Sequence, residues 1–377
     1  MFTISGTVLG SIKNLYVHDS GAQWTSGSEG YLLGFPESGA KDLAIAFEVF
    51  NKKIPNFFPE SFVKMFSELN APAHLRRSMI SPGVYKTLLI NFASALREAF
   101  SEISESSYLE TLVTGGCLLS SLKPARIDEA AFAERLLNSK NVSAVKTFAP
   151  TSGYANRVVY DRSATVTGRL TVKSGPRILT LAKKDRHIIK PSAPGNNIFS
   201  LDFVSLEPRL LLKYLGKKPG LDVYSDFCKA NNLQVSREQA KRAIVSTLYG
   251  GGVSSWGGSF SDSQAYSLQK VVKKYFDVVD TINFLESDIR EGIINNIFGR
   301  PIEVGNTRGP QLLNWWIQSS AVDAALLGFH QILEEYNAKP LYVIHDAIII
   351  EAASSPPESV CIAEFGDFPL KAEVLSE

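Results

Sequence analysis

Residues 197–216 read NIFSLDFVSLEPRLLLKYLG, and the two halves of this stretch have different patterns. The first half is a short apolar run that predicts a β-strand, and it ends near a carboxylate, Asp202. The second half predicts a helix, because Ser205 can cap it, Pro208 fits its first turn and Gly216 can end it. The stretch therefore predicts a strand and a helix that meet next to an acidic residue.

A second apolar run contains another acid in an unusual place. Residues 341–350 read LYVIHDAIII, a β-rich run interrupted only by His345 and Asp346. An ionised carboxylate among such residues is costly unless it is paired or bound to a cation. If the two strands are neighbours, Asp202 and Asp346 could share divalent metal, as in two-metal phosphoryl transfer. The alternative is two solvated, unconnected aspartates, and these two runs alone favour neither interpretation.

A third segment predicts a helix with a basic face. Ser236 and Gln239 form the S-x-x-Q pattern of a capping box, and the glycines at 250–252 can end the helix. Two cations one turn apart near a helix N-terminus suit a polyphosphate, and a valine and an aromatic further along can contact a ring. A lone R-x-x-x-K pattern is more often a solvated basic turn. The residues that share this face are spaced by four: Arg237, Lys241, Val245 and Tyr249.

The first and second of these segments resemble motifs of the family A DNA polymerases, the group of bacterial polymerase I and many phage replicases. Motif A of the family reads D-Y-S-Q-I-E-L-R, and this chain keeps its acids and its arginine at Asp202, Glu207 and Arg209. Motif C reads H-D-E, and this chain has His345 and Asp346 followed by an alanine.

Motif B and several flanking elements extend the resemblance over roughly residues 160–377. Motif B reads R-x-x-x-K-x-x-x-F-x-x-x-Y-G and is matched at Arg237, Lys241, Tyr249 and Gly250. Each flanking element is weak alone, but all occur in the family's order. They are T-G-R-L at 167–170, D-V-Y at 222–224, F-G-R at 298–300, Asn314 with Gln318 and the following S-S-A-V-D, and P-L-K-A-E-V at 369–374.

The resemblance implies catalytic roles. Asp202 and Asp346 would hold two Mg²⁺ ions, with Mn²⁺ as a substitute, and Lys241 would protonate the pyrophosphate leaving group. Lys241 and Arg237 would also bind the triphosphate of the dNTP. Tyr249 would lie at the pocket of the templating base. Glu207 would exclude a ribose 2′-hydroxyl.

The resemblance also implies contacts to primer–template DNA. Between Thr167 and Pro191 the chain carries seven Lys or Arg residues and one acid, Asp185. A solvated basic face is the alternative for this segment, but its position beside T-G-R-L favours a contact with the duplex backbone. The implied DNA-binding residues are Arg169, Asn314, Gln318, His345, Lys183, Lys184 and Arg186.

Three positions depart from the family pattern. Ala347 replaces the glutamate of motif C, which the single-subunit RNA polymerases also lack, so we expect activity to survive. Val245 stands where a Phe or Tyr stacks on the incoming base, and it takes part in the predicted dNTP site as a smaller contact. Tyr224 replaces a phosphate-contacting histidine.

The N-terminal part lacks the residues of a proofreading exonuclease. Before Asp128, itself a candidate helix N-cap, the only aspartates are Asp19 and Asp42, and no D-x-E occurs. We therefore expect no 3′→5′ exonuclease. The expected organisation is a divergent, possibly thumb-like N-terminal region at 1–115, a connecting or reduced thumb segment at 116–165, a palm at 166–221 and 311–377, and fingers at 222–310.

Composition sets few limits. Lys and Arg number 39 against 38 Asp and Glu, a formal charge of +1, which excludes a uniformly basic surface but permits a local basic groove. Three separated cysteines predict no disulfide framework. The first residues lack a signal-peptide pattern, and no apolar run is long enough to cross a membrane. We expect a cytoplasmic protein, in the host cytoplasm if a phage encodes it.

We expect an α+β right-hand polymerase with an antiparallel palm sheet and helical fingers. It would extend a primer 3′-hydroxyl with dNTPs, without proofreading and with replisome accessory proteins such as a helicase-primase or a processivity factor. Two alternatives stay open. One is a single-subunit RNA polymerase, against which Glu207 and T-G-R-L argue. The other is a degenerate polymerase kept as a DNA-binding or assembly protein.

Overall fold

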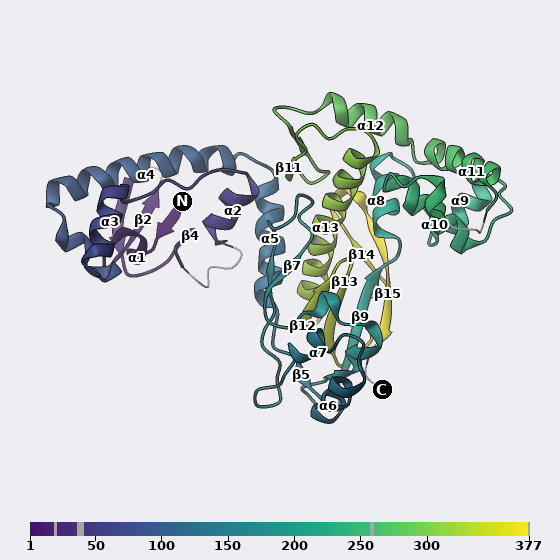
Figure 1. The fold of residues 1–377 in the computed structure, drawn as a ribbon, viewed down its shortest axis with the longest axis horizontal. Coiled ribbons are helices and arrows are strands. Elements are labelled where there is room, and N and C mark those ends of the chain that lie inside the picture. The colour runs from purple at the N-terminus through teal and green to yellow at the C-terminus, as the bar shows by residue number, and fades with distance from the viewer. Residues whose placement is uncertain (19–20, 36–40, 257–259, 376–377) are drawn as a thin grey trace. The chain divides into compact units, whose positions relative to one another are not determined.

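The computed structural model describes residues 1–18, 21–35, 41–256 and 260–375. The chain divides into two compact units, unit 1 (Met1–Ser120) and unit 2 (Ser121–Glu377). Figure 1 colours them in sequence order, so that unit 1 is purple to blue and unit 2 runs from blue-green to yellow. Among the described residues, no helix has both the length and the apolar character that a membrane crossing requires.

Unit 1 contains a four-stranded sheet with helices around it. The central strand β1 (Phe2–Ile4) pairs antiparallel with β2 (Asn14–His18) and parallel with β4 (Tyr31–Leu33), and β3 (Gly21–Thr25) pairs with the outer edge of β2. Apolar residues that recur at three- and four-residue steps predict helices over 59–69 and 85–100; both are present, and the second runs from Pro82 to Ser104. The helices of unit 1 are α1 (Gly6–Leu9), α2 (Leu43–Val49), α3 (Glu60–Glu68), the 3-10 helix η2 (Ala73–Met79), α4 (Pro82–Ser104) and α5 (Tyr108–Ser121).

Unit 2 is organised around a five-stranded antiparallel sheet. Its order is β12-β13-β9-β15-β14, so strands that are far apart in the sequence become neighbours at its centre. The mixed α and β composition and the antiparallel sheet confirm those parts of the predicted fold. The strands are β9 (Asn197–Phe203), β12 (Lys339–Ile344), β13 (Ala347–Ala352), β14 (Ser359–Cys361) and β15 (Asp367–Val374).

One long helix, α13 (Pro310–Glu335), packs on this sheet. The ring centroids of Phe203 and Phe329 lie 5.1 Å apart, which joins β9 to the helix. Gly328 permits this approach, since a Cβ atom there would lie 2.8 Å from the Phe203 ring. Most of the helix is buried, as the apolar density of residues 312–335 predicts.

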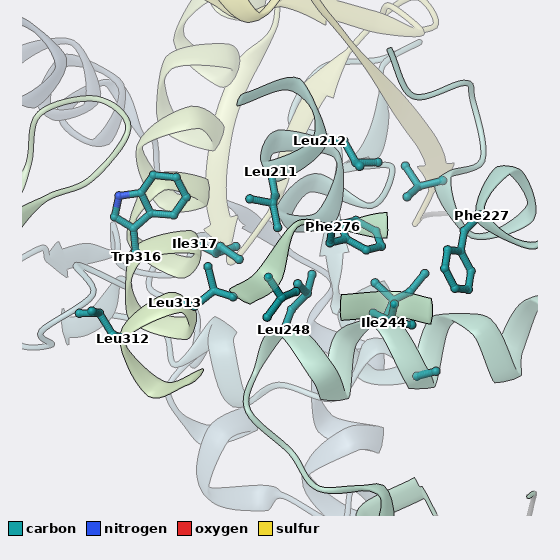
Figure 2. Packing of buried hydrophobic residues seen from close by; sticks show 14 of the residues in the cluster. Leu211, Leu212, Phe227, Ile244, Leu248, Phe276, Leu312, Leu313, Trp316 and Ile317 are labelled. Carbon is teal, nitrogen blue, oxygen red and sulfur yellow. The ribbon is translucent and has the colours of Figure 1, made fainter. Parts of the chain in front are cut away.

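Five shorter helices form the part of unit 2 between β9 and α13. They share one apolar core with α13, shown in Figure 2, in which Leu211, Ile244 and Ile317 meet from three different helices. Full burial of such a side chain stabilises a fold by roughly 1.5–3 kcal/mol, so this core holds the helices firmly against each other. The helices are α8 (Leu206–Tyr214), α9 (Val223–Ala230), α10 (Arg237–Leu248), α11 (Asp262–Tyr275) and α12 (Val278–Ser287).

The apolar pattern over residues 262–294 predicts a helical stretch, whereas the structure has two helices and the start of a strand there. Asp277 adopts a left-handed conformation, with φ of 46°, between α11 and α12. After α12 the chain turns into a short hairpin of β10 (Ile293–Asn295) and β11 (Pro301–Glu303). Helical periodicity continues across a single left-handed residue, so the break leaves little trace in the apolar pattern.

The remaining elements of unit 2 are small. Asp128 caps α6 (Glu129–Asn138), as predicted, by accepting hydrogen bonds from the amides of Ala130 and Ala131. The other elements are α7 (Val142–Lys146), the strand pairs β5 (Arg126–Ile127) with β8 (Ile189–Lys190) and β6 (Val159–Asp161) with β7 (Thr171–Ser174), and the 3-10 helices η3 (Ile178–Thr180), η4 (Lys183–Ile188), η5 (Val253–Trp256) and η6 (Ala363–Phe365).

Candidate active site

Asp202 and Asp346 lie next to each other at one end of the central strands. Asp202 is opposite Ala347 in the β9–β13 register, and Asp346 directly precedes Ala347. The amide of Phe203 donates a hydrogen bond to the carbonyl oxygen of Asp346, with 3.1 Å between nitrogen and oxygen. The two acids that the sequence singled out are therefore brought together by the pairing of β9 with β13.

Asp346 lies in a tight turn and not inside a strand, which corrects the interpretation of LYVIHDAIII as one run. Ile344 pairs with Ala347, so His345 and Asp346 form a two-residue connection between β12 and β13. His345 has a φ of 55°, a conformation that costs a residue with a side chain on the order of 1 kcal/mol or more. The paired strands on both sides hold this strained turn, and with it the position of Asp346.

The electrostatic surroundings of Asp202 are unusual for a residue open to solvent. Protein atoms that replace part of its hydration water, together with the nearby charge of Asp346, raise the pKa of Asp202 to about 6. The positive charges of Lys183, Lys241 and Lys371 act against this rise. Within the described part of the chain, neither aspartate side chain forms an ion pair or a hydrogen bond.

Glu207 lies beside this pair in a cluster of polar side chains. Its carboxylate accepts a short hydrogen bond from the Tyr249 hydroxyl and another, of 3.2 Å, from the Arg169 guanidinium. Burial raises the pKa of Glu207, and burial with the Glu207 charge raises the pKa of Tyr249. The cluster joins the start of α8 to the end of α10.

A cavity of about 260 Å³ collects many of the predicted site residues. Apolar side chains from α13 and from the start of α8 form part of its wall. Its polar lining comes from five segments that are distant in the sequence: Arg169, Glu207, Tyr249, Gln318, His345 and Asp346.

The basic face of α10 is only partly directed at this site. The predicted capping box of Ser236 and Gln239 is present. Lys241 is exposed, and its charge lowers the pKa of Asp202, whereas the Arg237 guanidinium donates a hydrogen bond to Asp222 at 2.7 Å. Both cations lie over the ring of Tyr224, at 5.2 Å for Arg237 and 6.0 Å for Lys241.

Two further predicted dNTP contacts lie on the same helix. Val245 is half-buried, one turn before Tyr249. Tyr249 is the C-cap residue of α10, and its hydroxyl turns to Glu207. Within this row of four residues, Arg237 and Lys241 thus share the ring of Tyr224, whereas Tyr249 contacts Glu207.

The predicted DNA contacts fall into two groups. Gln318 donates a hydrogen bond of 2.5 Å to Asn314 one turn earlier on α13, and it reaches the cavity that His345 and Arg169 also line. The pKa of His345 is lowered, first by burial and then by the charge of Arg169.

The second group belongs to η4. Lys183 forms an ion pair of 2.5 Å with Glu373, and Lys184 is exposed. Burial lowers the pKa of Arg186, while the charges of Glu373 and Asp202 act in the opposite direction. Lys183 and Arg186 therefore lie in the electrostatic field of Asp202, and none of the three cations lines the cavity.

Sequence reasoning missed Lys371 as a member of the site. Lys371 is opposite Asp202 in the β9–β15 register, so its side chain projects from the same face of the sheet. Its charge lowers the pKa of Asp202. The alternation of apolar and polar residues over 369–374 indicates a strand that contains Lys371. The sequence does not indicate which other strand pairs with it.

A buried polar network behind Arg169 was also missed. Gly168 has a φ of 71°, and a Cβ atom there would lie 2.4 Å from the Arg300 guanidinium. The Arg300 guanidinium donates a hydrogen bond to the backbone carbonyl of Arg162. The Arg162 guanidinium in turn forms an ion pair with Asp323, with 3.5 Å between nitrogen and oxygen. Asp323, an acid within the mostly apolar helix α13, was the sequence feature that could have indicated this network. The network fixes the segment that carries Arg169 against α13.

The donor set suits a hard divalent cation. Two carboxylates without a cationic partner offer the oxygen ligands that Mg²⁺ prefers. Within the described residues there is no group of three or more His, Cys, Asp or Glu side chains arranged for a metal ion. The remaining ligands of an ion here would have to be water, substrate or backbone oxygens, as is usual for Mg²⁺.

Comparison with solved structures identifies a similar fold. The POL domain of Pol1 from M. smegmatis, in complex with DNA primer-template and dNTP, matches with a TM-score of 0.56 and 12% sequence identity. The match covers 88% of this chain and 81% of that domain. No family model and no curated protein sequence matches the chain. The fold of this chain is therefore similar to that of a DNA polymerase domain.

Proposed function

We propose that this chain is a template-directed DNA polymerase of the family A type, which extends a primer 3′-hydroxyl with dNTPs. The observation that carries the proposal is the adjacency of Asp202 and Asp346, with Lys241 of α10 close enough for its charge to act on Asp202. The similarity of the whole fold to a polymerase domain supports the same activity.

Asp202 and Asp346 are the proposed metal ligands. Desolvation and then the neighbouring charge of Asp346 raise the pKa of Asp202, and a divalent cation would relieve the repulsion between the two carboxylates. Bound Mg²⁺ would supply charge neutralisation at the attacking and leaving oxygens of an in-line displacement. The residues themselves position the ions, and the strained turn at His345 keeps Asp346 in place.

Lys241 and Arg237 are the proposed triphosphate ligands. Lys241 is exposed and within the field of the acidic pair, so it is suited to neutralise a phosphate and to donate a proton to the leaving group. Arg237 is bound to Asp222 and Glu238 in exposed ion pairs. Exposed ion pairs contribute little free energy, so a triphosphate could replace these partners of Arg237 with only a small loss of stability.

Glu207 and Tyr249 are the proposed gate for the sugar and the templating base. Their hydrogen bond and the contact with Arg169 hold both side chains at the cavity next to Asp346. A carboxylate in this position would be desolvated further by a ribose 2′-hydroxyl, and this would disfavour ribonucleotides.

We propose the right-hand arrangement for unit 2, with the five-stranded sheet as the palm and residues 222–310 as the fingers. We also propose that the chain lacks a 3′→5′ exonuclease. Asp42 serves as the N-cap of α2, and Asp19 lies outside the described residues. The divergent N-terminal region at 1–115 and the reduced thumb at 116–165 remain part of the proposal.

Primer extension tests the proposal. Wild-type protein should extend a primer with dNTPs and Mg²⁺, and Asp346→Asn should reduce the rate by at least about a thousandfold, because the loss of a metal ligand removes transition-state stabilisation. Asp367→Asn, an exposed aspartate of the same sheet, is the control and should stay active. Mn²⁺ should substitute for Mg²⁺.

Either of two outcomes would contradict the proposal and favour another function. Primer–template binding by the wild type without any extension would identify a degenerate polymerase that acts as a DNA-binding protein. Extension with NTPs at the same efficiency as with dNTPs would identify an RNA polymerase and contradict the role of Glu207.

A further inference from the structure

Unit 1 contains a cavity that the polymerase proposal does not use. Its volume is about 810 Å³, within the range of ligand-binding sites. The turn between α1 and β2, strand β3, η2 and the start of α4 form its walls.

The charge of this cavity is positive. Lys13, Arg77 and Lys86 line it, and the described residues of its lining include no Asp or Glu. All three cations are exposed, and none forms an ion pair with a described residue. A site with three unneutralised cations attracts an anionic ligand.

The same cavity presents planar groups. The Arg77 guanidinium carbon lies 4.7 Å from the ring centroid of Trp24 and 5.1 Å from that of Tyr85. The Tyr85 hydroxyl donates to the carbonyl of Leu9 at 3.0 Å, so this ring is fixed. Guanidinium and aromatic planes are the surfaces on which nucleic-acid bases stack.

The floor of the cavity is held in place by backbone contacts. The amide of Arg77 donates to the carbonyl of Gly10 at 2.9 Å, which fastens η2 to the end of α1. Gly10 has a φ of 64°, and a Cβ atom there would lie 2.8 Å from the Cβ of Arg76. The planar groups and the cations are therefore presented by a preformed site.

We propose that this cavity binds single-stranded nucleic acid. A base would stack on the surface formed by Trp24 and Arg77, with the buried Tyr85 ring beneath the guanidinium, and the phosphates on either side would meet Lys13 and Lys86. Ile12, which is 84% exposed at the rim, would contact a sugar or a second base. This site includes none of the proposed polymerase residues, so a test of its binding does not depend on polymerase activity.

Binding of the full-length protein to a fluorescein-labelled oligo(dT), in EDTA and without dNTPs, tests the site. Lys13→Ala/Lys86→Ala should weaken binding by about tenfold and reduce the slope of log Kd against log salt by about 1.4, the value for two phosphate contacts on a single strand. Lys53→Ala/Lys64→Ala makes the same change in charge at exposed positions outside the cavity, and it should bind like the wild type. Affinity for a blunt duplex should be the same in all three proteins.

A photo-cross-link locates the strand. Oligo(dT) that carries 5-iodouracil should cross-link to Trp24, the partly exposed ring of the cavity. Equal affinities of the two double variants for oligo(dT), or cross-links confined to residues 121–377, would overturn the proposal. Displacement of the oligonucleotide by an acidic peptide of equal charge at equal concentration would also overturn it, because the site would then select charge and not bases.

Discussion

At the scale of single residues, the candidate site depends on side chains that are exposed and on backbone that is strained. His345 and Ser205 both have left-handed conformations, with φ of 55° and 56°, one in the turn that contains Asp346 and the other just after the strand that contains Asp202. Such conformations persist only when the surrounding structure enforces them. The identities of Asp202, Asp346 and Lys241 could be predicted from spacing, but these backbone conformations could not, because nothing in the residue type at either position requires them.

Val245 allows a residue-scale test of the dNTP site. Val245→Phe should lower the apparent KM for dNTPs by about threefold to tenfold, because an aromatic ring stacks on a base where a valine only touches it. Steady-state primer extension measures this constant. Val279→Phe, at a 56% exposed position of α12, is the matched control. An unchanged KM in Val245→Phe would show that this position does not contact the incoming nucleotide.

At the scale of elements, the sheet is tied to the loop before β9 through one buried acid. Glu351 of β13 is 2% exposed and accepts hydrogen bonds from the amides of Ser192 and Ala193 and from the side chain of Asn196. Burial alone would raise the pKa of Glu351, but these hydrogen bonds outweigh it and hold the pKa below its usual value. The ionised form is therefore the one that stabilises the fold.

Glu351→Gln should lower the free energy of unfolding by about 2 kcal/mol at pH 7, since charge-assisted hydrogen bonds are lost. A carboxyl group with a lowered pKa contributes stability above its unfolded value of about 4.3 and loses it as the pH falls through the folded value. The difference between wild type and variant should thus shrink below about pH 4. Urea unfolding across pH measures it, with the exposed Glu358→Gln as control. A difference that is constant with pH would rule out this role for the charge.

At the scale of the whole molecule, charge is distributed unevenly. The formal net charge is only +1, yet seven basic residues and one acid lie between Thr167 and Pro191. The end of this segment, η4, reaches the field of Asp202 through Lys183 and Arg186. A concentrated basic segment beside an acidic pair is compatible with a site that binds both a polyanion and metal ions.

Salt dependence tests this distribution. Lys183→Ala/Lys184→Ala should reduce the slope of log Kd against log salt for primer–template duplex by about 1.8, the value for two phosphate contacts on B-DNA. Fluorescence anisotropy at several salt concentrations measures the slope. Lys218→Ala/Lys229→Ala, which removes two exposed cations elsewhere in unit 2, should leave it unchanged. Equal slopes in the two variants would remove η4 from the DNA interface.

Local features of the sequence were sufficient for most helices. The caps at Asp128 and Ser236 and the dense apolar pattern over 312–335 predicted elements that the structure contains, because capping and periodicity depend on residues within a few turns. The types of residue in the site could be predicted for the same reason. Their roles in catalysis stay predictions.

The contacts between distant segments depend on the tertiary structure. Strand order places β9 between β13 and β15, so Asp202 meets Asp346 on one side and Lys371 on the other. The partners of Arg237 and Glu207 likewise come from other elements. A pairing register is set by how two remote strands bury their apolar faces together, and no window of sequence contains both strands. The residues of the site could therefore be named from the sequence, whereas their neighbours could not.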